Sequence, residues 1–184
     1  MQNNMKKQKN AFFLFAGISL LVFVFSLYFM TDYQDLFGLV GNRYSENKLV
    51  ADFHDDMMQP ANQIFFKFAV VAILTAVFAM MMEVRTKVAD KFALIVLCVL
   101  FAVLIGSAVY SLLQVTSLYN VYDNLDTSWV DDEGGTAHIR KYTAFYVGWA
   151  VYALQVISTA LLGLIMVKNH KDFIKLAKTA EQEA

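Results

Sequence analysis

The chain has 184 residues, 58% of them hydrophobic, and its 15 basic and 16 acidic residues leave a net charge of −1. Soluble domains are about half apolar and intersperse their apolar residues with polar ones, whereas here the apolar residues form long blocks. The composition therefore excludes an ordinary soluble domain. Because the chain has no excess of positive charge, we expect no nucleic-acid partner.

Four apolar blocks are long enough to cross a bilayer, which takes about 20 apolar residues in a helix. They cover residues 11–30, 61–82, 92–114 and 142–167. The sequence predicts an all-α fold: one integral membrane four-helix bundle over residues 1–184, with loops at 31–60 and 115–141 and a tail at 168–184. The first block exceeds the apolar core of a signal peptide, and no Ala-x-Ala site follows it, so we expect it to be retained.

The basic residues are distributed unevenly between the two sides of this predicted bundle. Ten of the 15 lie on the side that carries the two termini, whereas 11 of the 16 acids lie on the other. Short loops rich in Lys and Arg stay in the cytoplasm. The sequence therefore predicts that the N- and C-termini are cytoplasmic and that both long loops face out. The ten residues are Lys6, Lys7, Lys9, Arg85, Lys87, Lys91, Lys168, Lys171, Lys175 and Lys178.

The stretch ADFHDDMMQP, which precedes the second block, combines aspartates with one histidine. On a helix over 46–59, every fourth residue is apolar and the acids fall opposite, which is an amphipathic period. We expect Pro60 to end this segment and to open the second membrane helix. The segment is then a short helix on the outer surface. Its apolar residues are Leu49, Phe53 and Met57.

A metal site is the alternative for the same stretch. On an extended chain, side chains two residues apart share a face, and Asp and His together bind divalent cations. The candidate ligands are Asp52, His54, Asp55 and Asp56. The acidic loop at 115–141 lacks the residue order of a calcium-binding loop. We favour the surface helix and expect no cofactor.

Small residues recur at helical spacing in three of the blocks, and close approach of such residues holds membrane helices together. In the second block they form one alanine seam, defined as Ala69, Ala72, Ala76 and Ala79. Further packing positions in the third and fourth blocks are Ala102, Gly106, Gly148 and Gly163. We expect these residues to pack within the chain, although they would equally suit a neighbouring subunit.

Few polar groups fall within the blocks. Gln155 lies near the midplane, where we expect an interhelical hydrogen bond rather than a substrate contact. Lys67 lies one and a half turns inside the second block and can extend its side chain to the surface. Ion and proton pathways need ionisable groups at depth, so this interior argues against one. The tail at 168–184 either continues the fourth helix or lies on the inner leaflet.

The single cysteine, Cys98, lies inside the third block, and the sequence has no Asn-x-Ser/Thr site. The loops are thus without disulfides, which favours a prokaryotic plasma membrane. The first functional hypothesis is a non-catalytic scaffold or accessory subunit whose partners are the lipid bilayer and other membrane protein subunits or a second copy. The second is an oligomeric channel with an acidic outer vestibule. The third is an outer-face metal-dependent enzyme that uses His54 and the nearby aspartates.

Overall fold

The computed structural model describes residues 2–29, 48–82, 90–125 and 140–182. All regular structure in these ranges is helical, and four helices are long and apolar enough to cross a membrane. This confirms the prediction of an all-α fold with four membrane-length helices. The elements are α1 (Gln2–Phe29), α2 (Lys48–Asp52), the π-helix η2 (Phe53–Met58), α3 (Gln59–Met81), α4 (Lys91–Asn124) and α5 (Thr143–Gln182).

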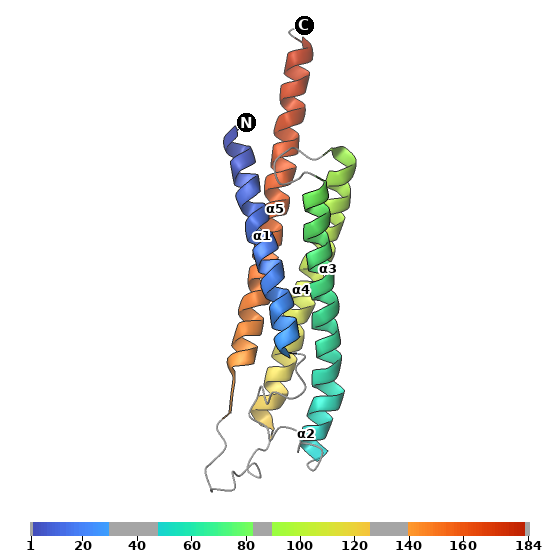
Figure 1. Cartoon of the computed structure of the whole chain (residues 1–184), viewed down its shortest axis with the longest axis vertical. Helices are drawn as coiled ribbons and strands as arrows, with labels where there is room; N and C mark the ends of the chain where they lie inside the picture. The colour runs from blue at the N-terminus through green and yellow to red at the C-terminus, as the bar shows by residue number, and fades with distance from the viewer. Residues whose placement is uncertain (1, 30–47, 83–89, 126–139, 183–184) are drawn as a thin grey trace.

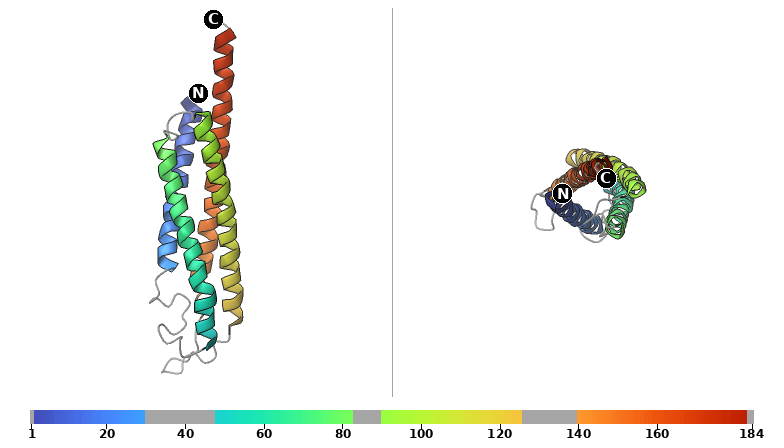
Figure 2. Two further views of the ribbon diagram at one scale, coloured as in Figure 1. Left: turned by 90° about the vertical axis from the view of Figure 1, so that its right-hand side faces the viewer. Right: turned by 90° about the horizontal axis from the view of Figure 1, so that it is seen from above.

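The four long helices form an elongated bundle in which neighbours along the chain run antiparallel (Figure 1). Seen along the bundle axis, they follow the order α1, α5, α4, α3 around a square (Figure 2). Both chain termini lie at one end of the bundle, which we call the terminal end. The opposite end, where α4 ends and α5 begins, is the distal end.

Aromatic rings fill the bundle core. The side chains of Phe25 on α1, Phe65 on α3 and Tyr152 on α5 are almost fully buried. The Tyr152 ring lies 5.4 Å from that of Phe65 and 5.8 Å from that of Phe25, with the latter pair edge to face. Such offset and edge-to-face pairs are favourable contacts for large apolar surfaces. The centre of the bundle is therefore a packed interior at this level.

Pro60 lies in the first turn of α3, as expected, but the expectation that it ends a separate surface helix is wrong. The torsion angles of Met58 and Gln59 are helical, so the chain runs from Lys48 to Met81 as one rod in line with the bundle axis (Figure 1). In an α-helix, the proline ring clashes with the carbonyl group four residues earlier. Here a π-turn precedes Pro60, in which the Gln59 N–H bonds to His54 O, five residues back. The helical rod thus continues into Pro60 directly from this wider turn.

The predicted loops 31–60 and 115–141 are helical in part, over residues 48–60 and 115–124. Beyond the third apolar block, α4 continues because its buried stripe continues: Val115, Leu118 and Tyr122 are 0–1% exposed. The predicted tail also continues the fourth helix, since α5 runs to Gln182 and projects past the start of α1 (Figure 1). A helix needs an apolar residue only at every third or fourth position to keep one face buried. It can therefore extend beyond the continuous apolar block from which it was predicted.

Candidate functional site

The alanine seam of α3 faces the bundle interior. Ala69, Ala72 and Ala79 are fully buried, and Ala76 is 8% exposed. Alanine side chains take little space between helices, so they allow close backbone approach. The seam therefore lies inside the chain in this structure and leaves no room there for a neighbouring subunit.

The predicted small residues of α4 and α5 fall into two groups. A Cβ atom on Gly148 would lie 3.0 Å from Phe25 Cζ and 3.1 Å from Val115 Cγ2, and one on Gly163 would lie 3.3 Å from Phe101 Cδ2. These glycines make room for large side chains of the adjacent helices. By contrast, Ala102 and Gly106 are exposed, and a Cβ on Gly106 would meet nothing within 4 Å.

Gln155 joins α5 to α1 in the middle of the bundle. Its side chain is fully buried, and its Nε2 atom donates to Ser19 Oγ and to Thr159 Oγ1, both at 3.2 Å. A hydrogen bond between helices holds them together in an apolar environment. Both donor positions of the Gln155 amide are therefore used by groups of the same chain.

Two further hydroxyl groups lie in the core without a hydrogen bond. Tyr152 OH and Ser111 Oγ are buried and have no partner of standard geometry among the described residues. The two hydroxyl groups lie near each other, although no hydrogen bond of standard geometry joins them. A buried polar group without a partner destabilises the folded state. These hydroxyls therefore stand apart from Gln155, whose polar atoms are satisfied.

Arg140 closes the distal end by capping α4. Its guanidinium donates to the carbonyl oxygens of Tyr122 at 2.8 Å and Leu125 at 2.9 Å, and also to that of Asp123. The last carbonyl groups of a helix have no partner in the helix and carry partial negative charge. Arg140, which lies just before α5, therefore donates hydrogen bonds to these carbonyl groups and neutralises their partial negative charge.

Aromatic residues around Tyr122 add to the contact that Arg140 makes at the distal end. We call Arg140, Tyr122, Tyr142 and Phe145 together the distal clamp. The Tyr122 ring packs 5.4 Å from Phe145 and 5.6 Å from Tyr142. The backbone N–H of Lys141 donates to Tyr122 OH at 3.0 Å, and Tyr142 OH donates to Asp123 Oδ1 at 2.7 Å. The hydrogen bond to the Asp123 carboxylate raises the pKa of Tyr142, because it stabilises the protonated phenol.

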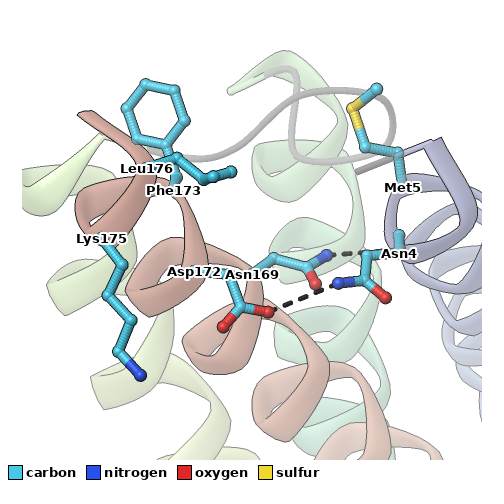
Figure 3. A pocket seen from close by; sticks show the side chains of 7 residues that line it. All are labelled: Asn4, Met5, Asn169, Asp172, Phe173, Lys175 and Leu176. Atoms are coloured by element: carbon cyan, nitrogen blue, oxygen red, sulfur yellow. Dashed lines mark hydrogen bonds between the residues drawn. The ribbon is translucent and has the colours of Figure 1, made fainter. Parts of the chain in front are cut away.

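Side-chain amides hold the terminal end together. Asn169 on α5 donates to Gln8 Oε1 at 2.7 Å and to the carbonyl oxygen of Asn4 at 3.3 Å, both on α1. Asn4 in turn donates to Asp172 Oδ2 at 3.4 Å (Figure 3). Beside these residues lies an open groove of about 340 Å³, which we call the terminal groove. Its apolar wall is formed by Met5, Phe173 and Leu176.

The acidic stretch before α3 does not form a cluster of three or more metal ligands within the described ranges. His54 Nδ1 lies 2.8 Å from Oδ1 of its neighbour Asp55, which is exposed. Asp52 and Asp56 belong to the same helical rod, on which residues two apart point in different directions. Of the candidate ligands for a metal ion, the described structure therefore joins His54 and Asp55 as one histidine–carboxylate pair.

Sequence reasoning missed the residues that fasten the two ends. Asn4 and Gln8 are spaced four apart, so they share a helix face, and this was the available signal for the terminal amides. Arg140 gave no such signal, since no pattern in the sequence around it indicates which helix end it caps. No protein-family model, curated protein sequence or solved structure matches this chain.

Proposed function

We propose that the chain is a multi-pass membrane bundle that acts as a non-catalytic scaffold or accessory subunit and associates with other membrane protein subunits. The observation that carries this proposal is the interior, which aromatic rings fill and in which Gln155 binds to α1 and to its own helix. Such an interior serves packing rather than turnover or transport. The surfaces left for function are then the outer faces of the helices and the two ends.

The charge distribution supports an orientation with the terminal end in the cytoplasm. Lys6, Lys7 and Lys9 precede the apolar part of α1, and four more lysines follow that of α5. Basic residues near the ends of membrane helices are retained on the cytoplasmic side. We place the protein in a prokaryotic plasma membrane, because its only cysteine, Cys98, lies within α4 and its sequence has no glycosylation site.

The association can be tested by extracting the full-length protein from its native membrane in a mild detergent and measuring the mass of the particle. We expect a discrete assembly that contains other membrane proteins in fixed ratio to this chain. Dissociating the partners should leave a folded, helical bundle. A particle that contains this chain alone, in one or many copies, would contradict an accessory role.

The orientation has its own test. A cysteine placed at Gly134, in a Cys98→Ser background, should react on intact cells with a thiol reagent that does not cross membranes. A cysteine placed at Ala184 should react only after the membrane is opened. The reverse labelling pattern would show that the terminal end faces outward.

A further inference from the structure

A second groove, of about 370 Å³, runs between α3 and α4 on the outer surface of the bundle. We call it the lysine groove, because Lys67 lines it. The helices α3 and α4 make the sparsest contact of the four neighbouring pairs. The walls of the groove are mostly apolar and include Phe68 and Val71 of α3 and Val103 of α4.

Gly106 helps to open this groove. It lies in the interior of α4, where glycine is about 1 kcal/mol less favourable than alanine. A Cβ atom there would meet nothing within 4 Å, so no contact within the described residues requires a glycine. Its effect is to leave space in the wall of the lysine groove.

Lys67 carries its charge into an apolar stretch. It lies four residues, about 6 Å along the helix, beyond Gln63, and residues 68–82 are uncharged. In the described part of the chain, no carboxylate forms an ion pair with it. An ionisable side chain at such depth is costly unless it reaches the interface or finds a counter-charge. Lys67 is exposed, so its side chain can reach the interface, where an anionic headgroup would supply the counter-charge.

The polar side chains of the groove come from both helices, Lys67 from α3 and Ser107 and Tyr110 from α4. Side chains on a helix lean toward its N-terminus, and the N-terminus of α3 lies at the distal end, so Lys67 leans that way. Tyr110 lies three residues nearer to the distal end than Ser107 and is half exposed. Val71 and Val103 line the part toward the terminal end. The groove thus combines one lysine and two hydroxyl groups with apolar side chains.

We infer that the lysine groove binds one anionic glycerophospholipid of the leaflet at the distal end. The phosphodiester lies against the Lys67 ammonium and the Tyr110 hydroxyl, and one acyl chain fills the apolar part beside Gly106. Lysine pairs with phosphate as a compact cation with several donors, and its alkyl stem remains in the apolar groove. The phosphate already lies near this depth, whereas a partner helix would have to bring in a buried carboxylate.

Native mass spectrometry of the full-length protein in detergent tests this inference. The probes are phosphatidylglycerol and diacylglycerol with identical acyl chains, so that they differ only in the phosphate headgroup. We expect one phosphatidylglycerol to remain bound and diacylglycerol to be lost. Equal retention of the two lipids would overturn the inference, because the charge of Lys67 would then play no part.

Variants locate the bound lipid. Lys67→Gln should weaken retention of phosphatidylglycerol about tenfold, the loss expected for one charged hydrogen bond, whereas Lys67→Arg should preserve it. Gly106→Leu should fill the groove and also remove the lipid. The matched controls are Lys141→Gln, which removes a lysine charge outside the groove, and Gly17→Leu, at a second described glycine with open space around it. Full retention in Lys67→Gln and Gly106→Leu would contradict the assignment.

A photoreactive side chain at Val103 then identifies the occupant in the native membrane without disturbing Lys67. Cross-linking should add the mass of one phospholipid to the chain. Cross-linking to a protein instead would show that the groove receives a partner helix, and would overturn the lipid assignment. The result is independent of the accessory role proposed above, which depends on the mass of the assembly and not on this groove.

Discussion

The two ends of the bundle are fastened in different ways. At the distal end, Arg140 caps α4 and a cluster of aromatic rings locks α4 to α5. At the terminal end, Asn169 and its amide neighbours bridge α5 to α1, and α5 then continues alone. Aromatic burial and charged hydrogen bonds contribute more to stability than neutral amide bonds. We therefore expect the distal end to be the more stable part.

The largest effect should come from Tyr122 at the centre of the distal clamp. Tyr122→Ala should lower the free energy of unfolding by about 3–5 kcal/mol, as expected when a buried aromatic side chain is removed. Tyr122→Phe keeps the ring and removes the hydroxyl group that accepts from the Lys141 N–H, so it should cost about 1 kcal/mol. Thermal unfolding in detergent measures both. Similar losses for the two variants would show that the hydroxyl, and not the packing, dominates.

Arg140→Ala should come next, with a loss of about 2 kcal/mol, because it leaves three carbonyl groups at the end of α4 without their cationic donor. Arg140→Lys should recover only part of the loss, since an ammonium lacks the planar fork of the guanidinium. Hydrogen exchange along α4 provides the measurement. Faster exchange should be confined to its last turns, and unchanged exchange there would refute the capping role.

The terminal end should respond less. Asn169→Ala removes the hydrogen bonds to Gln8 and to the Asn4 carbonyl, and we expect a loss of about 1 kcal/mol. Exchange should increase in the first turns of α1 and leave the distal clamp unaffected. If Asn169→Ala cost as much as Arg140→Ala, the proposed difference between the two ends would be wrong.

We expect the smallest effect on stability at the exposed wall of the terminal groove. Phe173 is 46% exposed, so Phe173→Ser should change the stability of the isolated bundle by less than about 0.5 kcal/mol. In the native membrane, the same variant tests whether the terminal groove binds a partner. If partners occupy the terminal groove, the assembly should lose them while the bundle remains folded, and the particle mass after mild extraction records the difference.

The sequence was most informative where a pattern repeats. Blocks of apolar residues predicted four membrane-length helices, because crossing a bilayer demands that composition over the whole length. Pro60 misled the prediction in part, since a rule for proline alone does not foresee that the chain before it stays helical through a π-turn. The α4 extension was missed because only one face of that stretch is apolar. Arg140 was beyond prediction, as its partners lie 15–18 residues away and meet it only in the folded bundle.

The length of α5 has a mechanical consequence. Its 40 residues form one continuous helix, and the 15 residues from Lys168 to Gln182 extend it by about 22 Å. A fluorophore or enzyme joined to this end would be held at a set height above the bilayer, and every four residues added or deleted in the helix would change that height by about 6 Å. Variants of α5 with different lengths could therefore be used to measure distances from the bilayer to neighbouring molecules.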